Sequence, residues 1–388
     1  MKNKFKVSVV GGAGHIGLPL SLFISSFGHD VTIIDTNQKV LEGLKGGNLP
    51  FYEDGLDKYL KKAQKNNIKL SNNNQDLSKS DFVIITLGSS SEAKDIDLFK
   101  KVMDDVIKNI KQESNIILRS TIDIGSIEEI RSNPEFIEKN INLAYCPERI
   151  AEGMSLIELP QIPQIIGISD ENDFLIFQNF FNTLNIESIK TTYQNAVFIK
   201  LFTNTYRYSE FSIVNEFFNI AQKNSIDFDE IIKIAKKEYP RLKNMPSKGF
   251  VGGPCLIKDS KTFYENYAKD NILLSAIQNI NTDFFKSILD TCNKLFEEKI
   301  VIQLGITFKP NSDDLRSSLS YEFNNYLREN GFKVYVVDKY VNQEDTDIEI
   351  FKYEDVKDKT KNLLISTYHD YFKNLDLNNK KVVVVGYK

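Results

Sequence analysis

The sequence predicts an α/β protein with two doubly wound, parallel-sheet domains that are joined by a helical middle domain containing one long central helix. Short apolar runs alternate with amphipathic helical segments over residues 1–190 and again over residues 286–388. This alternation is typical of parallel sheets covered by helices. Residues 191–285 are instead mostly helical in pattern, and residues 193–223 contain neither Gly nor Pro. We therefore expect three domains with these bounds.

The length and composition are those of a multidomain globular protein. At 388 residues the chain is too long for one ordinary domain, and 41% apolar residues are enough for several cores. The formal net charge is −4, and neither sign forms a dominant block. We therefore expect no nucleic-acid partner.

The cysteine pattern and the apolar runs indicate a soluble protein of a reducing compartment. Cys146, Cys255 and Cys292 are isolated and odd in number, so we expect neither a disulfide framework nor a metal site. The first apolar run, residues 7–10, is too short for a signal peptide. No stretch approaches the ~20 apolar residues that cross a bilayer. We expect a cytoplasmic protein without a membrane partner.

The first predicted strand, residues 5–10, leads into a glycine-rich turn. The turn consists of Gly12, Ala13, Gly14, His15, Ile16 and Gly17, and a helix over residues 19–27 and a strand over residues 31–34 follow it. Such a turn lets backbone amides and a helix N-terminus approach a pyrophosphate. Asp35 follows at close to the ~20-residue distance expected of the acid that binds the adenosine ribose. This predicts a Rossmann-like dinucleotide site, and Asp35 favours NAD over NADP because it would repel a 2′-phosphate.

Further strands are predicted at residues 82–86, 116–118 and 142–145, with a helix at residues 99–110. Ligands of doubly wound sheets bind beyond the carboxyl ends of the strands. The loops after these strands contain Ser89, Thr121 and Glu148. We expect Ser89 and Thr121 near the cofactor and Glu148 near the same cleft.

The middle segment predicts a long helix over residues 196–222, a second helix over residues 229–236 and a loop over residues 239–259. Lys200 and Asn204 are four residues apart and so share one face of the long helix. Taken alone, they would be a solvated lysine and a polar neighbour. The loop contains Arg241 and a Gly-Gly-Pro-Cys run that ends in Cys255.

A cysteine in a dinucleotide-dependent enzyme can carry an alcohol oxidation past the aldehyde. The thiol captures the aldehyde as a thiohemiacetal, which loses a second hydride to become a thioester that water opens. The alternative for Cys255 is a buried, inert thiol, which we disfavour because a Gly-Gly-Pro loop has no obvious demand for apolar packing. Cys146 and Cys292 are expected to be core residues.

The C-terminal part predicts a second sheet domain. After a helix-rich stretch at residues 273–296, the expected strands are residues 299–304, 333–337, 363–366 and 381–385, with a helix at residues 319–330. There is no second glycine-rich fingerprint, but the loop at residues 305–316 follows the first strand, where a nucleotide could bind. The polar stretch at residues 66–75 is expected to be a surface turn.

Together these residues resemble the UDP-glucose/GDP-mannose dehydrogenase family of nucleotide-sugar 6-dehydrogenases. The most specific element is the run from Gly252 to Asp259, which resembles the catalytic cysteine box of the family. The supporting elements are Ser120-Thr121-Ile122, Pro147-Glu148-Arg149, Lys200 to Asn204 leading to Asn215-Glu216, and Phe308-Lys309 to Asp313-Asp314-Leu315-Arg316. They occur in the order of the family and extend to about Arg316, and more weakly to His369.

The resemblance implies a four-electron oxidation of the C6 hydroxyl of a UDP-sugar, either UDP-glucose or a UDP-N-acetylhexosamine, to the uronate with two NAD. Cys255 would be the nucleophile, and Lys200 and Asn204 would stabilise the oxyanion. Asp259 would position a water with Lys200. Thr121 and Glu148 would assist proton transfer and thioester hydrolysis. The expected product is a precursor for polysaccharide synthesis.

The resemblance also implies the substrate contacts and a homodimer. Arg241 would reach the substrate site of the neighbouring subunit, and the long helix would form the dimer contact. Lysine and arginine suit a diphosphate because one is a mobile point charge and the other a planar fork. The residues implied in substrate binding are Glu148, Arg149, Lys200, Asn204, Arg241, Gly252, Lys309 and Arg316.

The sequence departs from the family pattern at two places, and two alternative functions stay open. Gly88-Ser89-Ser90 stands where the family usually has a threonine-proline pair, and Gln194-Asn195 replaces a common acidic residue. A β-hydroxyacid dehydrogenase would also pair a Rossmann domain with a lysine and asparagine on a long helix, but it transfers one hydride and needs no cysteine. A catalytically silent binder of NAD or of a nucleotide sugar is the other alternative. The sequence leaves the sugar and the general base undetermined.

Overall fold

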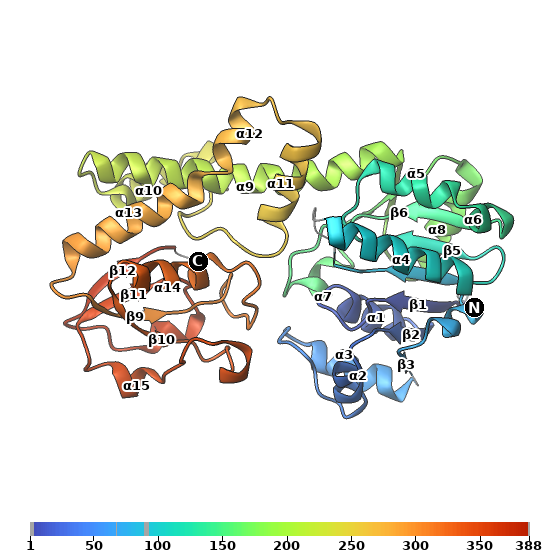
Figure 1. The fold of residues 1–388 in the computed structure, drawn as a ribbon, viewed down its shortest axis with the longest axis horizontal. Helices are drawn as coiled ribbons and strands as arrows, with labels where there is room; N and C mark the ends of the chain where they lie inside the picture. The colour runs from blue at the N-terminus through green and yellow to red at the C-terminus, as the bar shows by residue number, and fades with distance from the viewer. Residues whose placement is uncertain (1–3, 67, 89–92, 387–388) are drawn as a thin grey trace. The chain divides into compact units, whose positions relative to one another are not determined.

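The computed structural model describes residues 4–66, 68–88 and 93–386 and divides the chain into two compact units (Figure 1). The first unit is Met1–Leu201 and the second is Phe202–Lys388. The long helix α9 (Tyr193–Lys223) contributes residues to both units.

The first unit is built on an eight-stranded sheet with the strand order β3-β2-β1-β4-β5-β6-β7-β8. Neighbouring strands are parallel apart from β6 and β7, which pair antiparallel through Tyr145 and Gly167. The central strands are buried on both faces, as expected for parallel sheets. The strands are β1 (Lys6–Val10), β2 (Asp30–Ile34), β3 (Lys69–Ser71), β4 (Phe82–Ile85), β5 (Asn115–Leu118), β6 (Asn142–Tyr145), β7 (Gln164–Gly167) and β8 (Ser188–Thr191).

The helices of the first unit form two groups. Contacts join α1 to α3 and α7, and join α4 and α5 to α6. The chain leaves β1 toward β2 in one direction and continues from β4 toward β5 in the other, so right-handed crossovers place the two groups on opposite faces. The helices are α1 (Gly17–Ser26), α2 (Gln38–Lys45), α3 (Leu56–Lys65), α4 (Ala93–Asn109), α5 (Ile124–Ser132), α6 (Pro134–Glu138), α7 (Ser155–Glu158) and α8 (Glu171–Thr183).

The second unit contains a four-stranded parallel sheet with the order β10-β9-β11-β12. Its core includes phenylalanines from several elements, and Phe250 contacts the rings of Phe284 and Phe323. Besides part of α9, its elements are α10 (Phe228–Lys236), α11 (Leu256–Tyr267), α12 (Ile272–Ile277), α13 (Ile280–Leu295), β9 (Ile300–Leu304), α14 (Leu319–Glu329), β10 (Lys333–Val337), α15 (Tyr353–Val356), β11 (Asn362–Ile365) and β12 (Lys381–Val384).

The predicted α/β class, the two parallel sheets and the long helix are confirmed. The prediction of a surface turn at residues 66–75 is wrong in one respect. Residues Lys69–Ser71 form β3, which pairs with β2 at the edge of the sheet. Contacts group residues 202–388 into one unit, and the three-domain division stays a prediction. Across the described residues, no helix has both the length and the apolar content needed to cross a membrane.

Candidate active site

Within the glycine fingerprint from Gly12 to Gly17, two positions require glycine because of packing inside the protein. A Cβ atom at Gly12 would lie 2.6 Å from the carbonyl oxygen of Val9, and one at Gly17 would lie 2.4 Å from that of Gly11. At Gly14 a Cβ would meet the oxygen of Gly11 at 3.5 Å, which is ordinary contact. Packing within the protein therefore explains Gly12 and Gly17. Gly14 instead keeps the outer surface of the loop bare, which suits the close approach of a pyrophosphate.

Asp35 lies directly after β2 and is tied to the glycine loop. Its carboxylate accepts the N–H of Ala13 at 3.0 Å and the N–H of Asn37 at 3.0 Å. The side chain is only half-buried. An anchored, partly exposed carboxylate beside a loop without side chains fits the adenosine ribose of NAD.

Two residues of the loop, His15 and Ile16, lie at the start of α1. The ring of His15 stacks on Phe51 with 4.0 Å between centroids, and its Nδ1 lies 3.4 Å from Glu152 Oε1. Ile16 is the N-cap residue of α1 and is 39% exposed. Sequence reasoning missed Glu152 as a partner of the glycine loop, although it ends the loop that follows β6.

The remaining cofactor predictions concern loops at the carboxyl ends of β4 and β5. Thr121 follows β5 and is half-buried. Its neighbour Ser120 donates a hydrogen bond to the carbonyl of Leu87 at 2.8 Å, which joins the two loops. Ser89 lies outside the described residues.

Glu148 is buried and held as a carboxylate by Arg119. The Arg119 guanidinium donates two hydrogen bonds to Glu148 Oε2 and a third, of 2.6 Å, to Gln164 Oε1. The N–H groups of Arg149 and Ile150 donate to Glu148 Oε1 at 2.8 Å each. Burial raises the pKa of Glu148, but the charge and hydrogen bonds of Arg119 outweigh it and leave this pKa below its usual range. Glu148 is therefore charged at neutral pH.

Lys200 and Arg149 lie in the same unit as Glu148. Lys200 is buried on α9, and its charge further lowers the pKa of Glu148. Arg149 is half-buried and donates a hydrogen bond to the carbonyl of Pro163. A carboxylate with a lowered pKa is a weak base. Glu148 is therefore better suited to orient its neighbours than to exchange a proton.

Cys255 differs from the other two cysteines in exposure and position. It is exposed and is the N-cap residue of α11, whereas Cys146 and Cys292 are buried, as predicted. Burial raises the pKa of Cys146 and of Cys292 to about 12. The N-terminus of a helix favours a negative charge and so favours a thiolate. By position and exposure, Cys255 is the cysteine suited to nucleophilic chemistry.

Asn204 and Asp259 are brought together by α9 and α11. Asn204 Nδ2 donates to Asp259 Oδ2 at 2.6 Å. Asp259 is fully buried, and the ammonium of Lys258 lies 3.8 Å from its Oδ1. One turn of α11 separates Asp259 from Cys255. The asparagine, the acid and the thiol therefore belong to one local arrangement.

The loop that carries Cys255 is fixed at both ends. The Asn215 side chain on α9 accepts the N–H of Gly249 at 3.0 Å and donates to its carbonyl at 2.9 Å. A Cβ at Gly252 would lie 2.5 Å from the oxygen of Ser317, and one at Gly253, which has a φ of +91°, would lie 2.6 Å from the ring of Phe308. Both glycines are required because this loop packs against the loop after β9.

Three predicted substrate-binding cations lie in the second unit. The ammonium of Lys309 lies 5.2 Å from the centre of the Phe308 ring. Arg316 Nε donates to both carboxylate oxygens of Asp314 at 3.0 Å. Arg241 is exposed, and its guanidinium lies 5.5 Å from the ring of Tyr239. Arg316 is thus pre-positioned by an acid that the sequence prediction did not pair with it.

The predicted site residues divide between the units. The first unit brings Arg149 and Lys200 near Glu148 and places Asp35 against the glycine loop. The second unit brings Asn204 to Asp259 and packs Gly252 beside the loop of Lys309 and Arg316. The structure thus groups the predicted cofactor residues in one unit and the cysteine box in the other.

Comparison with known protein families agrees with this arrangement. Three models of the UDP-glucose/GDP-mannose dehydrogenase family match the chain. They are the NAD binding domain at residues 5–185, the central domain at residues 194–283 and the UDP binding domain at residues 302–387. Between them they cover most of the sequence.

Individual proteins show the same likeness. The chain is 28% identical to a UDP-N-acetyl-D-mannosamine dehydrogenase of Methanocaldococcus jannaschii, over 95% of this chain and 87% of that protein. It is also 28% identical to a putative UDP-glucose 6-dehydrogenase, YtcA, of Bacillus subtilis, over 86% of this chain and 81% of that protein. A UDP-glucose dehydrogenase structure from Pyrobaculum islandicum shares the fold, with a TM-score of 0.86, 21% identity, and coverage of 100% of this chain and 95% of that one.

The family matches account for the glycine loop, the cysteine box and the second sheet together. A β-hydroxyacid dehydrogenase needs neither of the last two. The chain belongs to the UDP-glucose/GDP-mannose dehydrogenase family and is an NAD-dependent nucleotide-sugar dehydrogenase.

Proposed function

We propose that the protein oxidises the C6 hydroxyl of a UDP-sugar to a carboxylate, with Cys255 as the covalent nucleophile. The observation that carries this proposal is the exposed Cys255 at the start of α11, next to a loop that contacts the UDP-binding region. UDP-N-acetyl-D-mannosamine is the first candidate substrate, because the relative named for it is covered more fully than the one named for UDP-glucose. UDP-glucose is the second.

The first unit holds the cofactor. Gly14 leaves the outer surface of the loop bare for the pyrophosphate, and Gly12 and Gly17 allow the tight packing of the loop. His15 and Ile16 directly precede α1, whose N-terminus faces the pyrophosphate. Asp35 binds the ribose, and Thr121 borders the nicotinamide. Bound NAD supplies the hydride acceptor, and two NAD are consumed for each sugar.

Cys255 holds the intermediate between the two oxidations. Its thiolate adds to the aldehyde carbon to give a thiohemiacetal, whose oxidation gives a thioester. Lys200 and Asn204 stabilise the negative oxygen of the adduct by charge and hydrogen bonding. Asp259 orients Asn204 and positions the water that releases the carboxylate. Its burial and its 2.6 Å hydrogen bond to Asn204 support this role.

Glu148 acts as a fixed carboxylate in this scheme. Its bonds to Arg119 and its lowered pKa favour a role in orienting Lys200 and water, with Thr121 assisting the proton transfers. Arg149 of the first unit, and Gly252, Lys309 and Arg316 of the second, are proposed to bind the nucleotide sugar. Arg241 reaches the substrate of the neighbouring subunit.

The active form is proposed to be a homodimer. Five large side chains on α9 are each between 45% and 65% exposed, and at 3.6 residues per turn they fall within about 60° of arc. They are Phe202, Tyr206, Ile213, Phe217 and Ile220. An apolar stripe of this kind on a long helix suits a second copy of the same helix.

The test is a substrate panel with the purified protein and NAD. The panel contains UDP-N-acetylmannosamine, UDP-glucose, UDP-N-acetylglucosamine, GDP-mannose and 3-hydroxyisobutyrate, with NADH formation as the readout. The proposal predicts turnover of a UDP-sugar and none of the hydroxyacid. Turnover of the hydroxyacid alone would contradict it.

A further inference from the structure

The carboxyl edge of the second sheet repeats the hydrogen-bond pattern that anchors Asp35 in the first. Asp338 directly follows β10, as Asp35 follows β2. It accepts the N–H of Ile306 at 2.9 Å and the N–H of Tyr340 at 3.0 Å. In both units the acid therefore holds the loop after the first strand and the N–H two residues further along the chain.

The two acids differ in what covers them. Asp35 is half-buried, whereas Asp338 is 2% exposed and lies 2.9 Å from Nε2 of the fully buried His369. His369 Nδ1 accepts the N–H of Asn311 at 2.9 Å. The proton of the neutral ring is therefore on Nε2, which donates to Asp338. This acid is thus covered by an imidazole and lacks the partial exposure with which Asp35 can meet a ribose.

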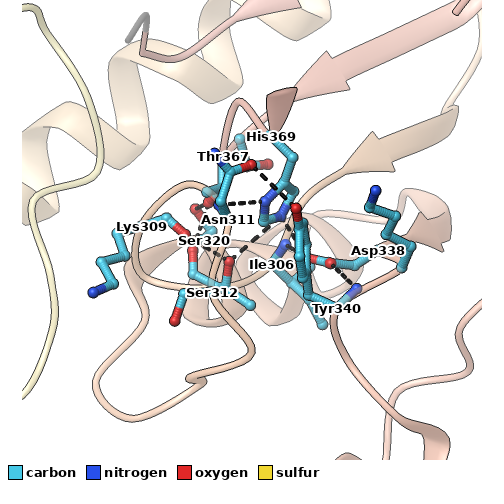
Figure 2. Close-up of polar contacts among 12 residues, drawn as sticks. Ile306, Lys309, Asn311, Ser312, Ser320, Asp338, Tyr340, Thr367 and His369 are labelled. Carbon is cyan, nitrogen blue, oxygen red and sulfur yellow. Dashed lines mark hydrogen bonds and ion pairs between the residues drawn. The ribbon is translucent and has the colours of Figure 1, made fainter. Parts of the chain in front are cut away.

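His369 connects the ends of three strands (Figure 2). Asn311 follows β9, Asp338 follows β10 and His369 follows β11. The ring is packed among aromatic side chains, with Tyr340 at 5.0 Å and Phe372 at 5.3 Å between centroids. It is therefore a rigid bridge and not a mobile surface side chain.

The bridged segment carries Lys309. Thr307 Oγ1 donates to the carbonyl of Lys309 at 2.9 Å, and Thr367 Oγ1 donates to the carbonyl of Thr307 at 2.5 Å. The Lys309 side chain points away from this cluster (Figure 2), whereas its backbone carbonyl is held within it. The ring of Phe308, which lies between Thr307 and Lys309 in the chain, leaves no room for a Cβ at Gly253 of the cysteine loop.

We propose that the Asp338–His369 pair positions the nucleotide sugar by holding the loop of Lys309 in place. Because His369 covers Asp338, the same pair also prevents a dinucleotide from binding at the second sheet. The inference rests on the proposed function in one respect, namely that Lys309 binds the substrate diphosphate. Neither residue of the pair touches the substrate. Both act through the backbone of residues 307–311.

The test uses His369→Gln and Asp338→Asn in the full-length protein, with His29→Gln as the matched control. His29 is also a buried histidine whose Nδ1 accepts a backbone N–H, that of Phe5 at 3.1 Å, but it belongs to the first unit. Each protein is titrated with UDP and, separately, with NAD by calorimetry. Thermal unfolding reports on folding, and steady-state kinetics give KM and kcat.

We expect His369→Gln and Asp338→Asn to weaken UDP binding and raise the sugar KM on the order of tenfold or more, because a displaced loop misplaces Lys309. NAD affinity should not change, and the wild type should bind one NAD per chain. His29→Gln should leave UDP affinity at the wild-type value. His369→Asn, which keeps an acceptor near Nδ1, should recover part of the loss.

Folded variants of His369 and Asp338 that bind UDP as tightly as the wild type would overturn the positioning role. A second NAD bound per wild-type chain would overturn the claim that the pair prevents a dinucleotide from binding at the second sheet. A wild type that does not bind UDP at all would instead refute the proposed function, and the inference with it.

Discussion

Arg119 donates two hydrogen bonds to one carboxylate oxygen of Glu148, and both side chains are buried in the first unit. A buried pair of this kind contributes little net stability compared with apolar residues, but breaking it is costly because one charge is left without a partner. The effect of breaking this pair on the free energy of unfolding can therefore be predicted without reference to any substrate.

Replacing Arg119 with Met should lower the free energy of unfolding at neutral pH by about 3–5 kcal/mol. In a Glu148→Gln background the same replacement should cost less, because no buried carboxylate is left unpaired. Urea denaturation of the two single variants and the double variant measures this coupling. Additive effects of the two changes would contradict the pairing.

The same pair predicts a pH dependence. The folded pKa of Glu148 lies below its unfolded value, so the pair stabilises the protein above about pH 4.3, the ordinary value for glutamate. That contribution is lost as the pH falls toward the lowered folded pKa. The difference in unfolding free energy between the wild type and Glu148→Gln should therefore shrink on acidification. A constant difference would mean that Glu148 has no shifted pKa.

Cys255 should be the one cysteine that reacts in the native protein. Cys146 and Cys292 are buried with pKa values raised to about 12, so iodoacetamide should modify Cys255 alone and stop turnover. Peptide mass spectrometry locates the label. Cys255→Ser should lose steady turnover but keep its NAD affinity, while Cys292→Ala serves as the buried control. Full activity of the labelled protein would remove Cys255 from the mechanism.

Asp35 should set the cofactor preference. Its carboxylate, anchored to Ala13, would repel a 2′-phosphate, so kcat/KM should be higher with NAD than with NADP. Asp35→Asn should reduce this ratio on the order of tenfold, since one charge repulsion is removed. Asp30→Asn, at the opposite end of β2, is the control. A wild type that prefers NADP would refute this assignment.

The exposed stripe on α9 should hold two copies together. Ile213→Glu combined with Phe217→Glu places charge in the middle of the stripe and should convert the dimer to a monomer. Ile272→Glu, at a residue that is 88% exposed on α12, should leave the dimer intact. Light scattering after size-exclusion chromatography measures the mass. A monomeric wild type would contradict the proposed homodimer.

The sequence best predicted those parts of the fold and site whose residues lie next to one another along the chain. β1, the glycine loop, α1, β2 and Asp35 follow one another along the chain, and each has a sequence pattern with one physical reason. β7 and β8 were missed because neither has a long apolar run: β7 reads Gln-Ile-Ile-Gly and β8 reads Ser-Ile-Lys-Thr. β3 has three residues at a sheet edge and so resembles a turn.

The polar pairs could not be predicted because their partners are distant in the sequence. Arg119 and Glu148 meet only because β5 and β6 are neighbours, and Asp338 meets His369 across two strand ends. In the sequence each is an ordinary charged or polar residue after a strand. For Arg119 and Glu148 the sequence did predict the carboxyl edge of the sheet at which they lie.

A four-electron oxidation through Cys255 is tested by the amount of NADH formed from a limiting amount of the UDP-sugar selected by the panel. We expect two NADH per sugar and a uronate product from the wild type, and neither from Cys255→Ser in steady turnover. One NADH per sugar, with an aldehyde or ketone as the product, would contradict a four-electron oxidation through Cys255.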